Sequence, residues 1–140
     1  MGLNILGAKQ WFAPIAVAVL ITSHAAPAAQ LAIHIHSERA MFQVLISPGT
    51  VGIDGFVLQL MSGNGKKLPA KEATLYLSLP ERGIEPLKRK ATLGSDGYWH
   101  VPDVPIPFPG RWHVRIDART DFQQITLEDD FDVPARSPGQ

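Results

Sequence analysis

Glycine and proline recur along this chain at intervals too short to leave room for long helices. Each occurs 12 times in 140 residues, and they gather at breaks such as Pro48-Gly49, Gly63-Asn64-Gly65 and the segment 80–83. The stretches between the breaks are rich in β-branched, leucine and aromatic residues, which favours strands. Short strands separated by frequent turns are typical of a β-sandwich. We therefore expect an all-β fold, an Ig-like antiparallel sandwich of about seven short strands.

Five segments are the clearest strand predictions. Within residues 73–79, Leu75, Leu77 and Leu79 alternate with more polar neighbours, the period of two expected of a half-buried strand. Asp96-Gly97 predicts a tight hairpin turn. The proline-rich residues 102–109 predict an extended, exposed connection. The five predicted strands are 41–47, 56–61, 73–79, 112–118 and 125–133.

The N-terminal segment has the composition of an export signal. Lys9 is its only charged residue, an apolar run at 11–22 follows, and Ala26-Pro27-Ala28 offers a cleavage sequence. The run is shorter than the roughly 20 residues of a spanning helix. We expect a periplasmic or otherwise extracytoplasmic domain, tethered to the inner membrane only if the leader is not cleaved. The predicted division is a signal peptide or uncleaved anchor at 1–29, a folded domain at 30–133 and a flexible tail at 134–140.

The overall composition excludes several classes of function. Lys and Arg total 13, as do Asp and Glu, so no basic surface for nucleic acid is predicted. The absence of cysteine excludes blue-copper electron-transfer sites, cysteine-based zinc sites and thiol catalysis. The acidic run at 128–130 lacks the spacing of a calcium loop and is interpreted as a solvated face. No catalytic motif is present, so we do not expect an enzyme.

His34-Ile35-His36, followed by Met41, is the strongest candidate for a binding site. In a strand, residues i and i+2 point to the same face about 7 Å apart. The two imidazoles can therefore converge on one ion while Ile35 faces the core. Imidazole suits copper and zinc, and the thioether of Met41 shifts the preference toward Cu(I). In the alternative interpretation, the histidines form a solvated strand face and the methionine fills a gap in the core.

Three further residues are candidates for a second site: His100, His113 and Met61. In Trp99-His100-Val101 and Trp112-His113-Val114, alternation favours inward tryptophans and valines with outward histidines. If the two strands pair, His100 and His113 approach each other instead, as a weaker metal or pH-sensitive site. Met61 ends a predicted strand, where it either reaches a site at the edge of the sandwich or simply packs.

An ordered set of short motifs resembles a known family. The set covers residues 33–133 and resembles the extracytoplasmic β-sandwich domain that ends CopD-type copper-resistance membrane proteins, often called YtkA-like. The motifs are His34-Ile35-His36, Ala40-Met41, Pro48-Gly49, Gly83-Ile84-Glu85-Pro86, Gly97-Tyr98-Trp99, Pro109-Gly110-Arg111-Trp112 and Asp121-Phe122.

The resemblance implies a copper-handling module on the outer side of a membrane. It implies that His34, His36 and Met41 are the family's histidine–methionine cluster, with Cu(I) favoured as the ion and Cu(II) possible. The implied partner is an inner-membrane copper transporter or a periplasmic copper carrier. One apolar segment precedes the domain here instead of the family's bundle of membrane helices, so we expect a soluble or singly tethered module. The alternative is a non-metal Ig-like periplasmic protein-interaction module associated with a membrane complex.

Overall fold

The structure is a computed structural model that describes Gly2 and residues 30–135. Apart from Gly2, the predicted leader at 1–29 lies outside the described residues, as does the tail from 136 to 140. Within the described part of the chain, no helix is long and apolar enough to cross a membrane.

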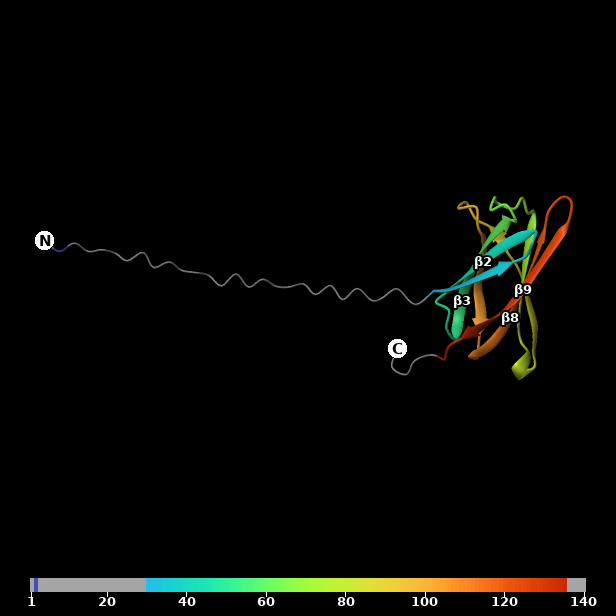
Figure 1. Cartoon of the computed structure of the whole chain (residues 1–140). Helices are drawn as coiled ribbons and strands as arrows, with labels where there is room; N and C mark the ends of the chain where they lie inside the picture. The colour runs from blue at the N-terminus through green and yellow to red at the C-terminus, as the bar shows by residue number, and fades with distance from the viewer. Residues whose placement is uncertain (1, 3–29, 136–140) are drawn as a thin grey trace.

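Two antiparallel β-sheets pack face to face, which confirms the all-β sandwich prediction (Figure 1). In spatial order, the first sheet contains β1 (Leu31–His36), β2 (Ala40–Ser47), β3 (Gly52–Ser62), β7 (Trp99–Ile106) and β6 (Thr92–Leu93). In spatial order, the second sheet contains β5 (Ile84–Lys90), β4 (Glu72–Leu79), β8 (Gly110–Arg119) and β9 (Gln124–Val133). A 3-10 turn, η1 (Pro80–Arg82), follows β4.

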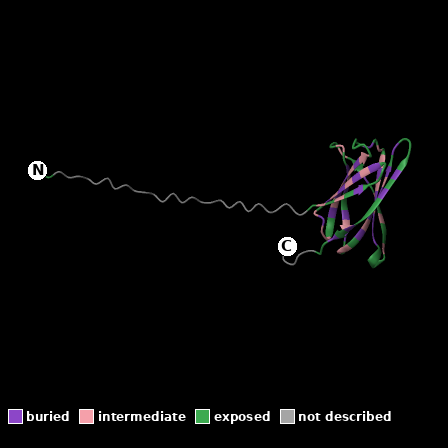
Figure 2. Ribbon diagram, viewed as in Figure 1, coloured by how far each residue is buried: buried purple, intermediate pink, exposed green. Residues whose placement is uncertain are grey.

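The core lies between the sheets and is filled from alternate positions of each strand. Trp112, Phe42 and Phe56 are its largest fully buried side chains. Buried and more exposed residues alternate along the ribbons in Figure 2, which is the period of two that strand geometry imposes. The alternation predicted for residues 73–79 is therefore confirmed. Each sheet also presents an outer face of half-buried and exposed side chains, on which a binding site can form.

The segment 102–109, predicted to be an extended and exposed connection, is extended but only partly exposed. Strand β7 continues to Ile106, and both Val104 and Ile106 are fully buried. The ladder to β3 shifts register between Asp54 and Phe56, which marks a bulge that accommodates the prolines. Proline is tolerated at bulges and where a strand has an open side, and β6 pairs with only the first two residues of β7.

Nine strands are present in the described residues, against about seven predicted. Strand β5 was missed because Pro86 lies inside it, and proline normally signals a break. As an edge strand of its sheet, β5 has one side on which a missing N–H costs nothing. The hairpin predicted at Asp96-Gly97 is confirmed, since it joins β6 to β7 and the Gly94 amide donates to the Tyr98 carbonyl at 2.8 Å.

Candidate metal-binding site

Strand β1 presents both histidines of the His34-Ile35-His36 motif on one face. The two side chains are exposed, and their rings are nearly parallel with centroids 6.4 Å apart. Ile35 points the other way and is 4% exposed, as the alternation predicted. β1 is an edge strand of the first sheet, so the histidines lie at the border of its outer face.

The strand register places Met41 directly opposite His36. A tight turn fixes this pairing, because the Ser37 hydroxyl accepts hydrogen bonds from the amides of Arg39 and Ala40 at 3.2 and 3.1 Å. Directly opposed residues in an antiparallel pair have Cβ atoms about 4.5–5.5 Å apart. The predicted imidazole and thioether are therefore neighbours on the outer face, and Met41 is half-buried there.

Met61 continues the same line across the sheet. It lies opposite Met41 in the β2–β3 register and is half-buried on the outer face. The three opposed residues His36, Met41 and Met61 form what we call the His/Met row. Met61 also lines a hollow of about 340 Å³ between the 62–67 turn and the 94–98 hairpin, together with Lys67 and Tyr98. Sequence spacing alone did not reveal the row, since it depends on the register of β3.

His34 belongs to the neighbouring line of positions. It lies opposite Gln43, so one amide side chain is its direct cross-strand neighbour, and Gln59 lies one strand further, opposite Gln43. Its ring is within reach of the His36 ring, but it has no thioether directly opposite. Within the described residues, no group of three or more His, Cys, Asp or Glu side chains could hold a metal. The candidate site on this face therefore consists of the two imidazoles of β1 and the methionine sulfurs beside them.

His100 is on the same outer face but does not join the His/Met row. It pairs with Val57, four residues from Met61 and so about 13 Å along β3. Its Nε2 atom lies 2.8 and 3.0 Å from the two carboxylate oxygens of Asp96. This contact, helped by the Tyr98 amide, lowers the pKa of Asp96. The imidazole of His100 therefore contacts a carboxylate within its own hairpin and not the His/Met row.

The possible pairing of His100 with His113 is wrong. His100 is on β7 in the first sheet and His113 is on β8 in the second, so the core separates them. Both histidines do face outward while Trp99 and Trp112 are buried. The alternation predicted for the two Trp-His-Val segments is therefore confirmed.

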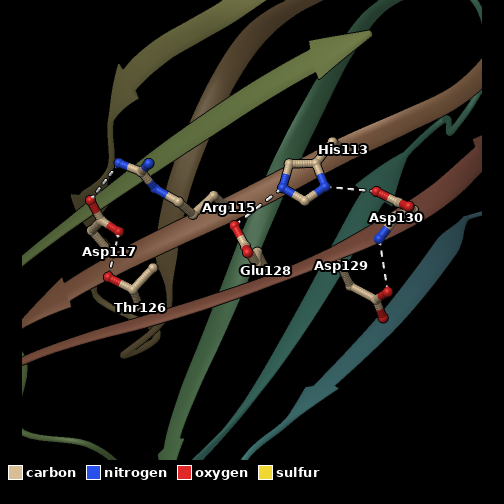
Figure 3. A network of polar contacts seen from close by, with 7 residues as sticks. All are labelled: His113, Arg115, Asp117, Thr126, Glu128, Asp129 and Asp130. Atoms are coloured by element: carbon tan, nitrogen blue, oxygen red, sulfur yellow. Dashed lines mark hydrogen bonds and ion pairs between the residues drawn. The ribbon is translucent and has the colours of Figure 1, made fainter. Parts of the chain in front are cut away.

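His113 is the centre of a polar network on the outer face of the second sheet (Figure 3). Asp130 and Glu128 on β9 flank its ring, and Figure 3 shows Arg115, Asp117 and Thr126 following along the same face. The hydrogen bond to Asp130 is the main cause that raises the pKa of His113, although partial burial opposes it. The acidic residues 128–130 are exposed and take part in this network. This agrees with their interpretation as a solvated face.

The two sheets and the exposed His/Met row define the chain as an antiparallel β-sandwich with a candidate metal-binding face. No family model and no curated protein matches the sequence. The fold is similar to that of FetP from uropathogenic E. coli, in the form isolated after expression in the E. coli periplasm. The two chains are 8% identical, the match covers 77% of this chain and 97% of FetP, and the TM-score is 0.55.

A second solved structure of FetP gives the same result. It is a copper-bound variant in which glutamine replaces one glutamate, with 9% identity, 79% of this chain and 95% of FetP covered, and a TM-score of 0.56. At such low identity the likeness shows the shared fold alone.

Proposed function

We propose that this chain is an extracytoplasmic copper-binding module whose ligands include His34, His36 and Met41. The observation that carries the proposal is the strand register, which sets an imidazole and a thioether side by side on an exposed face. The second imidazole, of His34, has its ring centroid 6.4 Å from that of His36. An imidazole–thioether set favours copper over harder ions.

The proposed site is suited to delivering copper rather than to holding it permanently. Structural metal sites are usually closed by four protein ligands, whereas this one lies on the outer face of a sheet at its edge strand. Imidazole accepts either oxidation state of copper, and the thioether favours Cu(I). A partner can approach the open side of the ion and exchange ligands with it. We infer a non-catalytic role in copper homeostasis.

Two further observations support this proposal. One solved structure with the same fold is described as copper-bound, and another was obtained by expression in the periplasm. The ordered motifs of the sequence resemble the YtkA-like domain of CopD-type proteins, which implies the same cargo. The partner we infer is an inner-membrane copper transporter or a periplasmic copper carrier.

A Cu(I) competition titration tests the proposal. The full chain, expressed with its own leader, is compared with the double variant His34→Ala/His36→Ala and with Gln43→Ala as a matched control on the same face. We expect one-to-one binding by the parent and the control, and loss of binding in the double variant. Equal binding by all three proteins, or no binding by the parent, would refute the proposed function.

A protein-interaction module is the second candidate, and one loop favours it. Phe122 is 96% exposed at the tip of the β8–β9 hairpin. The loop is ordered beneath it, because the Thr120 hydroxyl accepts hydrogen bonds from the Phe122 and Gln123 amides at 3.2 Å. An exposed aromatic side chain on an ordered loop is the kind of anchor found at interfaces. If this is the main function, Phe122→Ser abolishes partner capture while the histidine substitutions have no effect.

A further inference from the structure

We propose that Met61 is an additional copper ligand, so that Cu(I) is held on the His/Met row across three strands rather than between the two histidines of β1. This inference rests on the proposed copper function and specifies its ligand set. It assigns the soft ion to His36, Met41 and Met61, and it leaves His34 as a ligand of secondary importance for Cu(I).

The register is the first argument for this assignment. Met41 is the central residue of the row, with His36 opposite it on β1 and Met61 opposite it on β3. Each neighbour has its Cβ atom about 4.5–5.5 Å from that of Met41. The unbranched methionine side chain has three rotatable bonds, so both sulfurs can swing toward one ion beside the His36 ring.

The position of His34 is less favourable for a shared Cu(I). It is two residues from His36 on the same strand, whereas Met41 lies directly opposite His36 on the neighbouring strand. Its cross-strand neighbour is Gln43, which offers no sulfur. The thioethers that Cu(I) prefers therefore both lie in the row of His36, and neither lies directly opposite His34.

The surroundings of Met61 are the second argument. The core side of this part of β3 is filled by Leu60, which is 4% exposed, so Met61 is not needed as a core filler. Instead it lies on the outer face and lines the 340 Å³ hollow beside Lys67 and Tyr98. Met61 is therefore a half-buried methionine on the outer face, beside an open hollow and outside the core.

The matched variants are Met61→Leu and Gln59→Leu. The first removes one thioether at nearly constant volume, a change that costs little stability. The second makes a hydrophobic change two residues along the same strand, on the same outer face and outside the row. Thermal unfolding of the apo proteins shows that both variants are folded before copper is added.

Two measurements on the full chain then decide the inference. In Cu(I) competition titrations, we expect Met61→Leu to bind about tenfold or more weakly than the parent, with Gln59→Leu unchanged. X-ray absorption at the copper edge is expected to show two sulfur ligands in the parent and one in Met61→Leu. Cu(II) binding, followed by electron paramagnetic resonance, is expected to be the same in all three proteins, because thioethers contribute little to the harder ion.

The outcomes separate this inference from the proposed function. If the parent does not bind Cu(I), both are overturned. If the parent binds and Met61→Leu matches it in affinity and sulfur count, the copper function stands and the role of Met61 is refuted. An equal loss of Cu(I) and Cu(II) binding in Met61→Leu also refutes it, since a soft ligand should affect Cu(I) alone.

Discussion

His113 on β8 and Asp130 on β9 lie directly opposite each other, with Nδ1 of the histidine 2.6 Å from a carboxylate oxygen of the aspartate. The other ring nitrogen lies 3.3 Å from Glu128. Arg111 approaches the same Asp130 at 3.6 Å, and Ser78 faces His113 from β4. The histidine therefore lies between two carboxylates, which favour its protonated form.

The raised pKa of His113 makes stability depend on pH. The folded state holds the proton of His113 more tightly than the unfolded state does. The stabilisation of the fold by protonated His113 is therefore complete below about pH 6.5, and it is lost as the pH rises through the pKa of His113 in the folded state. We expect His113→Gln to be less stable than the parent at about pH 5.5 and nearly equal to it at about pH 9. Urea unfolding across this range measures the difference. A gap that stays constant with pH would contradict the ion-pair account.

Asp54 gives a pH effect of the same direction from a different cause, because here the fold disfavours the charged form of the side chain. The residue is 1% exposed, and neither carboxylate oxygen accepts a well-formed hydrogen bond from the described residues, although the Gly49 amide lies near the carboxylate. Burial raises the pKa of Asp54, and the backbone amide of Gly49 offsets only part of this effect. The folded state therefore binds an extra proton above about pH 3.8, so stability falls as the pH rises through the raised pKa.

We expect Asp54→Asn to unfold with a free energy about 1 kcal/mol or more above that of the parent at neutral pH, because an unpaired buried charge is removed. Toward about pH 3 the gain should shrink, since the carboxyl is then protonated in both states. Guanidinium unfolding at the two pH values measures the difference. Destabilisation at neutral pH would indicate that the carboxylate has a favourable partner.

The burial of the end of β7 is testable by truncation. Ile106 is fully buried, so Ile106→Ala should lower the free energy of unfolding by about 2–5 kcal/mol. The control is Ile53 on β3, which pairs with Pro105 of β7 and is 62% exposed. Ile53→Ala should change the free energy of unfolding by about 0.5 kcal/mol or less. Equal small effects would restore the interpretation of residues 102–109 as an exposed connection.

Copper affinity should fall on acidification. Protons compete with the metal for the imidazole nitrogens, so each histidine ligand adds to the pH dependence of binding. We expect Cu(I) affinity to decrease more steeply with falling pH in the parent than in His36→Ala. Competition titrations at several pH values measure the two slopes. Identical slopes would exclude His36 as a ligand.

Local patterns predicted much of the fold. The outward histidines and buried Ile35 of β1 follow from alternation, and the hairpin at Asp96-Gly97 follows from its turn residues. The prolines of β5 and β7 misled the prediction because their compatibility with a strand depends on tertiary context. Proline is tolerated on edge strands and at bulges, which are the positions of Pro86 and Pro102. The local sequence does not show which strand will lie at an edge or where a bulge will form.

The arrangement of the site was only partly predictable. The proximity of His36 and Met41 requires only one short turn, which Ser37 closes. The position of Met61 depends on the register between β2 and β3. The connection between these two strands is longer than the turn between β1 and β2. The contact of His113 with Asp130 likewise spans 17 residues. A shift of a single residue in either ladder would turn these side chains to the opposite face.

Because the His/Met row draws on three separate strands, it exists only once β1, β2 and β3 have paired. A peptide carrying His34 and His36 alone would contain both imidazoles but neither sulfur. High affinity for a soft ion would then be a property of the assembled sheet, and the unfolded chain would lack it. Metal affinity in this protein would then report on folding, and copper would bind only to folded molecules.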